Sequence, residues 1–352
     1  MIPFVELKRP NHDRVRELLA ASEASGTWSN FGPASRRLEE VIGERLALPA
    51  DRRAVACANG TVALHGLIQL HEHLAGRPLR WVVSAFTFHA QKQGPLAAAI
   101  VVDCDADGQL DLEELCALPA EDYDGIVVTR LFGAARRSER YVDWAARAGK
   151  VLLFDSATCF SSRDGDLPFG HRGHGDVFSF HHTKPLGFGE GGCVVVPAAA
   201  EPVFRSLINF GLYQGIETAG RSMNGKMSDV AAAFILDRLE DEDRIRRGHR
   251  EQFARLAGCA RSLGLQMLVD GEIAGCLPTL APVVFPRPVP LERLASLPVV
   301  LHKYYRPVAP RPRADALYAR VVCLPCHPGM ASLSDAEVCR ILASLAHSSR
   351  EG

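Results

Sequence analysis

The sequence has almost no net charge, no long hydrophobic run and no internal repeat. Its 40 lysine and arginine residues are balanced by 41 acidic residues, which leaves a formal charge of -1. This balance gives the protein no overall attraction to nucleic acids or anionic membranes. No apolar stretch is long enough to span a bilayer, and the charged segment MIPFVELKRPNHD lacks the apolar centre of a signal peptide. We therefore expect a cytoplasmic protein that binds neither nucleic acid nor membrane.

Disulfides are not expected either, although the chain has 10 cysteines. They are scattered through a long chain and several lie in apolar runs, which is typical of reduced, buried thiols. Cys323, Cys326 and His327 form a C-x-x-C-H pattern, the spacing used to attach c-type haem. Haem attachment usually requires export, and a thioredoxin-like pair requires a surrounding βαβ pattern that is absent here. We interpret the motif as a strand that enters a proline-rich turn, and we predict no metal site.

Short apolar runs alternate with helix-compatible segments between residues 54 and 196. This alternation is typical of an α/β domain with a buried, largely parallel sheet. The predicted strands cover residues 54–58, 81–85, 100–103, 125–129, 151–155, 177–180 and 193–196. The predicted helices between them cover residues 61–74, 89–97, 112–118 and 139–148.

The pattern then changes to a smaller α+β region. A long helix dense in mixed charge is predicted over residues 228–263, and mixed charge of this kind is typical of a solvated or partner-facing surface. Strands are expected at residues 279–285 and 299–302, and the sequence SDAEVCRILASLAH predicts a capped amphipathic helix. We expect a large domain with the N-terminal segment over residues 1–240 and a small C-terminal domain over residues 241–352.

The segment HHTKPLGFGEGG, residues 181–192, matches the glycine pattern G-x-G-x-x-G. A dinucleotide loop with this pattern follows a strand and opens a helix, because the helix N-terminus holds the pyrophosphate. Here the glycines lead directly into the β-branched sequence CVVV, so the context of a dinucleotide loop is absent. The candidate functional residue of this segment is therefore Lys184, although a lysine in a glycine-rich connection is most often a solvated turn residue.

Three other features of the sequence favour a functional role for Lys184. Asp155 ends an apolar strand, where parallel sheets usually bind ligands, although a helix N-cap would look the same. Gly60 and Thr61 open a helix and favour an anion such as phosphate, although plain capping would also place small residues there. Phe86 and Phe88 end another strand, either to cover a planar ring or to pack in the core. Together these parts are the ones that pyridoxal phosphate requires.

The sequence resembles the DegT/DnrJ/EryC1/StrS family of sugar aminotransferases, which have the aspartate aminotransferase fold (fold type I). The resemblance runs over nearly the whole chain. It is carried by GTWSNFGPASRRLEE, NGTVALHG, AFTFHA, LLFDSA, GDVFSFHHTKPLGFGEGG, NGKMSDVAAA, YYRPV and LPCHPGM. The last segment resembles the family's Leu-Pro-x-His-Pro-Gly turn, which is a further reason to set haem aside. The resemblance implies a large domain with a mostly parallel seven-stranded sheet and a smaller α+β domain.

The resemblance also implies how the chain binds pyridoxal phosphate. Lys184 is expected to form the Schiff base, Asp155 to pair with the pyridine nitrogen, and Phe88 to stack on the ring. Thr158 stands where the family usually has Gln or His beside the coenzyme, and it reaches less far. Lys226 stands where many members have Arg.

The phosphate is expected to bind to Gly60, Thr61 and Ser179. The resemblance adds Asn224 of the neighbouring subunit to this set. That contact implies a homodimer with shared active sites at the interface.

Within the family, FSFHHTK and NGKMSDVAAA most resemble the nucleotide-sugar 4-aminotransferases, which act on 4-keto-6-deoxyhexoses usually linked to dTDP. We expect a ping-pong transamination with L-glutamate as amino donor. Lys184 would move the proton, and we expect burial and the protonated ring to depress its pKa. The acceptor wall is expected to include Trp28, Asn30, Phe31, Tyr304, Tyr305 and Arg306.

Other functions remain open from the sequence. The acceptor is alternatively a 3-keto sugar, a UDP- or GDP-linked sugar, or a cyclitol ketone. A coenzyme-binding regulator without turnover is disfavoured, because both Lys184 and Asp155 are retained. A related pyridoxamine-dependent dehydratase is disfavoured as well, because those relatives lack the Schiff-base lysine.

Overall fold

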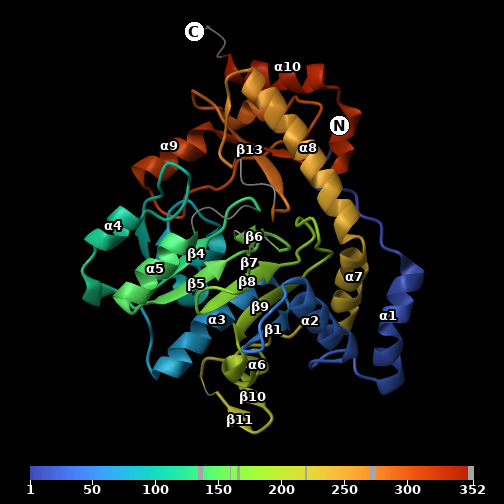
Figure 1. Ribbon diagram of the computed structural model, residues 1–352, viewed down its shortest axis with the longest axis vertical. Coiled ribbons are helices and arrows are strands. Elements are labelled where there is room, and N and C mark those ends of the chain that lie inside the picture. Colours follow the sequence, from blue (N-terminus) through green and yellow to red (C-terminus); the bar gives the residue numbers. More distant parts are fainter. Residues whose placement is uncertain (134–137, 159, 165–166, 219, 270–274, 348–352) are drawn as a thin grey trace.

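The computed structural model describes residues 1–133, 138–158, 160–164, 167–218, 220–269 and 275–347. A large sheet forms the middle of the molecule, and helices cover both of its faces (Figure 1). A smaller sheet lies with α8 (Glu242–Ser262) and α10 (Asp335–Ala346) at the upper end of the view. The predicted α/β architecture with a smaller α+β region is confirmed.

The large sheet has seven strands in the order β1-β9-β8-β5-β4-β2-β3. Their bounds are β1 (Arg52–Cys57), β2 (Trp81–Ser84), β3 (Ile100–Val102), β4 (Gly125–Thr129), β5 (Val151–Asp155), β8 (Gly175–Ser179) and β9 (Gly192–Pro197). The strands from β3 to β8 pair in parallel, whereas β9 is antiparallel to both β8 and β1. The prediction of a mostly parallel seven-stranded sheet is confirmed, and each predicted strand overlaps an observed one.

Both faces of this sheet are buried, which explains why its strands are nearly continuous apolar runs. Val83, Val127 and Leu153 belong to the hydrophobic cluster on the face of α3 (Gly60–Ala75). Their neighbours Val82, Val128 and Leu152 belong to the cluster on the opposite face, which includes residues of α5 (Ser138–Ala148). Successive side chains of one strand thus enter different layers.

The remaining helices of the large region pack around the sheet. They are α1 (His12–Ser25), α2 (Pro33–Arg45), α4 (Leu112–Ala117), α6 (Glu201–Leu207) and α7 (Asp229–Glu240). Asn11 caps α1, since its side chain accepts hydrogen bonds from the amides of Asp13 and Arg14. A third buried cluster joins α2 and α7 to β1 and β9.

The C-terminal region is built on the antiparallel strands β12 (Gln266–Met267), β13 (Leu280–Val284) and β14 (Val321–Pro325), with α9 (Pro312–Arg320) beside α8 and α10. The predicted capped helix is α10, where Ser334 and Glu337 form a capping box. The structure also contains two short hairpins: β6 (Arg163–Asp164) with β7 (Leu167–Pro168), and β10 (Leu212–Tyr213) with β11 (Ile216–Glu217).

Three predictions of local structure are wrong. The expected helix over residues 89–97 is a pair of 3-10 turns, η1 (His89–Lys92) and η2 (Gly94–Leu96), because Gly94 has a φ of 53° and precedes a proline. The expected helix over residues 228–263 is divided between α7 and α8 at Asp241. The expected strand over residues 299–302 makes only isolated bridges, from Val299 to Ile2 and from His302 to Cys323.

The junction between β9 and the start of α3 leaves no room for a side chain at Gly192. A Cβ atom there would overlap the main chain of Asn59 and Gly60. We therefore expect Gly192→Ala to lower the free energy of unfolding by about 3 kcal/mol or more, measured by urea denaturation. The control is Gly258→Ala on the exposed face of α8, where an added Cβ meets no atom within 4 Å. The control should raise the free energy of unfolding by up to about 1 kcal/mol, and equal effects of the two changes would contradict this account.

Candidate active site

The candidate site lies where the carboxyl ends of β4, β5 and β8 meet at one edge of the sheet. Thr129 ends β4 and pairs in register with Asp155, which ends β5. Ser179 ends β8, the next strand along the sheet. Because β8 also faces the start of α3 at Gly60, this edge carries a carboxylate, hydroxyl groups and a helix N-terminus together.

Asp155 is a buried carboxylate, with 5% of its surface exposed. Its Oδ2 accepts a hydrogen bond of 2.9 Å from Gln91 Nε2, and its Oδ1 accepts one of 3.1 Å from the amide of Ala157. Burial raises the pKa of Asp155, and the hydrogen bonds and the charge of Lys184 oppose that rise. A cationic partner at this carboxylate would therefore be strongly favoured.

Gln91 is a site residue that the sequence did not reveal. Its side chain is fully buried on η1 and bridges Asp155 to Thr129, whose Oγ1 lies 2.5 Å from Nε2. The Oε1 atom of Gln91 is buried and has no hydrogen-bond partner among the described residues. The only signal in the sequence was a polar residue close behind Phe88, and its direction depends on the 3-10 turn that replaces the expected helix.

Lys184 lies in a tight loop between β8 and β9. Its amide donates to His181 O at 2.8 Å, and the amide of Gly187 donates to Lys184 O at 3.0 Å. A Cβ atom at Gly187 would overlap the carbonyl oxygen of His181, so only glycine fits there. Lys184 is partly buried, and its charge acts on the pKa of Asp155, which places the two side chains within electrostatic range.

The N-terminus of α3 forms a cradle for an anion. Asn59 already accepts hydrogen bonds from the amides of Val62 at 2.9 Å and Ala63 at 3.1 Å. The amides of Gly60 and Thr61 belong to the same first turn, where a helix offers no carbonyl partner. A Cβ atom on Gly60 would lie 3.0 Å from the Cβ of Ser179, so the open backbone of Gly60 faces that serine.

Asn224 lies on the surface beside this cradle. The amide of Ala58 donates to Gly225 O at 2.8 Å, and Lys226 bridges to Cys57. The exposed Asn224 side chain accepts a hydrogen bond of 2.8 Å from Lys226 Nζ. Burial lowers the pKa of Lys226, which also lies 4.5 Å from the ring of Phe210.

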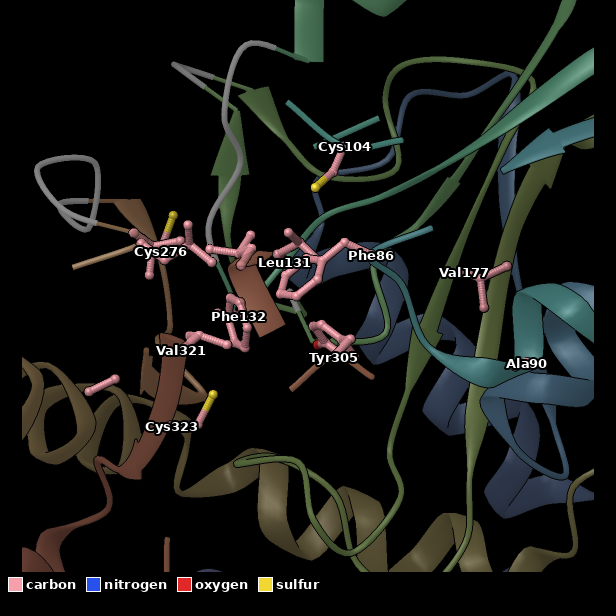
Figure 2. Close-up of a cluster of buried hydrophobic side chains, with 14 of the residues drawn as sticks. Phe86, Ala90, Cys104, Leu131, Phe132, Val177, Cys276, Tyr305, Val321 and Cys323 are labelled. Atoms are coloured by element: carbon pink, nitrogen blue, oxygen red, sulfur yellow. The ribbon is translucent and has the colours of Figure 1, made fainter. Parts of the chain in front are cut away.

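The two phenylalanines after β2 have different environments. Phe86 is fully buried and packs edge-to-face on Tyr305, with ring centroids 5.9 Å apart, inside the hydrophobic cluster of Figure 2. Phe88 is 50% exposed, which leaves a ring face open to a ligand. Of the two, Phe86 is therefore a core residue.

The residues expected to form the acceptor wall are not alike. Trp28 is 43% exposed, and Asn30 and Arg306 are also exposed.

Phe31 is buried, and the guanidinium of Arg205 lies 4.8 Å from its ring centroid. Tyr305 is buried against Phe86 and Phe132, as Figure 2 shows, and Tyr304 is half-buried beside Phe4 and His302.

Thr158 binds the protein backbone. Its hydroxyl donates to Arg130 O at 3.0 Å and accepts from the amide of Gly133 at 3.2 Å. These bonds hold the chain that follows β4, so Thr158 supports the loop next to Asp155.

The cysteines of the C-x-x-C-H pattern lie in the core. Burial raises the pKa of Cys323 to about 12 and also raises that of Cys326, which is opposite to the shift in reactive thiols. In the described part of the chain, no group of three or more His, Cys, Asp or Glu side chains is arranged to hold a metal. None of the described helices combines the length and apolarity needed to cross a membrane.

Comparison with known proteins identifies the family. The model of the DegT/DnrJ/EryC1/StrS aminotransferase family matches residues 11–269. The chain belongs to this family. The protein Mb3436c of Mycobacterium bovis is 31% identical over 255 residues, which cover 69% of this chain and 61% of that protein. The chain thus spans less than two thirds of the length of this curated relative.

Two further relatives match over more of their length. The dTDP-4-amino-4,6-dideoxy-D-glucose transaminase of Shigella dysenteriae is 24% identical over 87% of this chain and 88% of that protein. The L-glutamine:2-deoxy-scyllo-inosose aminotransferase of Streptomyces fradiae is 27% identical over 70% of this chain and 63% of that protein.

Solved structures confirm the predicted aminotransferase fold. A DegT/DnrJ/EryC1/StrS aminotransferase from Brucella abortus superimposes with a TM-score of 0.81 at 22% identity, over 96% of each chain. DesI, solved in the presence of its TDP-sugar product, superimposes with a TM-score of 0.77 at 27% identity, over 96% of this chain and 90% of that one.

The raised pKa of Asp155 predicts that this residue lowers the stability of the protein. A carboxyl group whose pKa is higher in the folded state than in the unfolded state destabilises the folded state at pH values above the ordinary value for aspartate. Asp155→Asn should therefore raise the thermal unfolding temperature at pH 7. The gain should shrink as the pH falls through the raised pKa and vanish below the ordinary value for aspartate.

Asp124 is a control of opposite sign. Hydrogen bonds from Arg77 hold the pKa of Asp124 well below its usual range, so Asp124→Asn should lower the unfolding temperature at pH 7. The difference in unfolding temperature between Asp124→Asn and the wild type should also disappear on acidification. An Asp155→Asn protein that unfolds at a lower temperature than the wild type at pH 7 would contradict the raised pKa of Asp155.

Proposed function

We propose that this protein is a pyridoxal phosphate-dependent aminotransferase that transfers the amino group of L-glutamate to a nucleotide-linked keto sugar. The best candidate for the acceptor is a dTDP-4-keto-6-deoxyhexose. The observation that carries the proposal is the buried carboxylate of Asp155 within electrostatic range of Lys184, at the sheet edge that also holds the anion cradle of α3.

The residues of the site fit pyridoxal phosphate. The amides of Gly60 and Thr61 and the hydroxyl of Ser179 are donors suited to a phosphate group at a helix N-terminus. Asp155 is a buried carboxylate that favours a cationic ring nitrogen. The half-exposed ring of Phe88 offers a flat face, and Lys184 offers the amine. When bound, the coenzyme supplies an aldehyde that condenses with amines and a ring that accepts electrons.

The protein side chains then have separate tasks. Asp155 holds a proton on its partner nitrogen, and Gln91 and the amide of Ala157 fix the orientation of its carboxylate. Lys184, once its amine is released, acts as the base and acid that moves a proton at the amino donor's Cα. We propose that burial and the nearby ring cation keep the amine of Lys184 neutral for part of this cycle.

We also propose a homodimer with shared active sites, in which Asn224 of one subunit contributes to the phosphate cradle of the other. The side chain of Asn224 is exposed and therefore accessible to a neighbouring subunit, which supports this arrangement. The exposed Trp28, Asn30 and Arg306 are the best candidates for acceptor contacts, because Phe31 and Tyr305 are committed to packing.

The names of relatives support the choice of acceptor. The relative from Shigella dysenteriae is named for a dTDP-linked 4-amino sugar, and DesI was solved with a TDP-sugar product. A cyclitol ketone is the second candidate, because relatives from Streptomyces fradiae and Streptomyces lividus act by name on 2-deoxy-scyllo-inosose. A GDP-linked sugar is the third candidate for the acceptor, since a GDP-perosamine synthase of Vibrio cholerae is 25% identical.

The acceptor is tested by offering the purified protein dTDP-4-keto-6-deoxyglucose with L-glutamate and measuring 2-oxoglutarate. We expect turnover that is faster than with a 3-keto sugar, a GDP-linked keto sugar or a scyllo-inosose. Turnover of one of these ketones with no product from the dTDP sugar would overturn the choice of acceptor. Failure with every ketone, in a protein that binds the coenzyme, would favour a regulator.

The role of Lys184 is tested by Lys184→Ala. Loss of the amine that moves the proton should lower kcat by about 10²–10⁴-fold or more. The control is Lys150→Ala, which removes a lysine that donates to Ala120 O and Tyr123 O, each at 2.7 Å. This control should keep the wild-type rate, and a Lys184→Ala enzyme as fast as the control would refute the mechanism.

A further inference from the structure

The loop that carries Lys184 is wrapped around the amino group of a second lysine, Lys8. The Nζ atom of Lys8 donates hydrogen bonds to His182 O at 2.7 Å, to Gly187 O at 2.6 Å and to Lys184 O. Only 9% of Lys8 is exposed. The contacts join the N-terminal segment to a loop that lies 174 or more residues away in sequence.

This arrangement satisfies every donor of the buried cation. An ammonium group has three N–H donors and no acceptor, and here three carbonyl oxygens receive them. A buried charge without such partners would be very costly, so the loop and Lys8 stabilise each other.

A second cation completes the set of contacts. Arg238 of α7 donates through Nε to Pro185 O at 2.9 Å, and its Nη2 binds Glu6. The carbonyl oxygens of residues 182, 184, 185 and 187 therefore all point toward positive charge. Without Lys8, three carbonyl dipoles would face one another across an empty space, and the loop would have to change its conformation.

We propose that Lys8 is the positioning residue of the Lys184 loop, which fixes the place from which the Lys184 side chain reaches the reaction centre. This inference rests on the proposed function of Lys184. Lys8 is not itself an amine for the coenzyme, because its amino group is turned onto the three carbonyls.

The electrostatics agree with this placement. Burial, followed by the charge of Arg238, lowers the pKa of Lys8 to about 7, and the charge of Lys184 acts in the same direction. The three carbonyl acceptors favour the ammonium form.

The test compares Lys8→Ala, Lys8→Met and the matched control Lys150→Ala. Lys150 also donates to backbone carbonyls, those of Ala120 and Tyr123, but it precedes β5, at the opposite end of that strand from Asp155. Amide hydrogen exchange is measured by mass spectrometry on peptides that cover residues 181–190, in the full chain without coenzyme. The rate of transamination is measured on the same proteins with coenzyme, L-glutamate and the best acceptor.

A chemical rescue makes the test specific. n-Propylammonium has the carbons and the ammonium group that Lys8→Ala removes, whereas the methionine side chain of Lys8→Met fills the space that this ion needs. The ion should therefore restore Lys8→Ala and leave Lys8→Met unchanged.

We expect the amides of residues 181–190 to exchange faster in both Lys8 variants than in the wild type, while the rest of the chain exchanges at the wild-type rate. We expect kcat to fall by about 100-fold, with a smaller change in KM. The control should match the wild type in both measurements, and n-propylammonium should restore Lys8→Ala alone. Unchanged exchange at residues 181–190, uniform acceleration over the whole chain, or absence of rescue would each overturn the proposal. Lys8→Met keeps most of the apolar side chain and removes the ammonium group, so the exchange comparison remains decisive if Lys8→Ala does not fold.

The exchange measurement also separates this inference from the proposed function. It needs neither coenzyme nor substrate, so it reports on the loop even if every ketone fails. Faster exchange in the variants with an inactive wild-type protein would refute the proposed function and leave Lys8 as the residue that holds the loop. Normal exchange with an active enzyme would do the reverse.

Discussion

The candidate site depends on backbone segments that pass each other more closely than a Cβ atom allows. Gly192 at the start of β9 lies against the main chain of Asn59 and Gly60, and Gly187 lies against the carbonyl oxygen of His181. Gly60 in turn faces Ser179. Because of these contacts, the lysine loop, the end of β8 and the first turn of α3 form one closely packed corner. The glycines that suggest a dinucleotide loop in the sequence are there to let this corner close.

Buried charge at the same edge gives the corner its chemistry. Burial raises the pKa of Asp155 more than its hydrogen bonds and the charge of Lys184 lower it, and Lys8 is held in the loop by carbonyl oxygens. Arg130, which follows β4, stabilises the neighbouring strands β5 and β8. Its guanidinium lies between the rings of Phe154 and Phe169 and donates to Asp176 at 2.6 Å. Its amide also donates to Asp155 O at 2.9 Å. Asp155 is thus a carboxylate whose partners in the folded chain do not fully offset its burial, as expected of a site whose ligand supplies the missing partner.

Much of the fold follows from the sequence, because the strands of a sheet buried on both faces are unbroken apolar runs. The same logic places Asp155 at a strand end, whereas Ser179 is expected in the site only through the resemblance to the family. Helix α1 gives a weaker signal, since only Val15 and Ser22 of its residues are buried. The resemblance to the family, confirmed by the match over residues 11–269, added the roles that spacing alone left open.

The rest depends on contacts between distant residues. Gln91 reaches Asp155 only because the chain makes 3-10 turns at residues 89–96 where the sequence predicts a helix. Lys8 stands in a charged N-terminal segment, and nothing in its local sequence points to a loop so far along the chain. Phe31 and Trp28 are close in sequence, yet one is buried and the other exposed, because Asn30 and Phe31 both have positive φ angles.

The central claim is that Lys184 is the amine that binds the coenzyme. It is tested most directly by incubating the full-length protein with pyridoxal phosphate, reducing it with sodium borohydride, which fixes the coenzyme to the amine that has condensed with it, and mapping the modified peptide by mass spectrometry. The account predicts one phosphopyridoxyl group, on Lys184. Modification of Lys8 in its place, or an unmodified Lys184 in protein saturated with coenzyme, would contradict it.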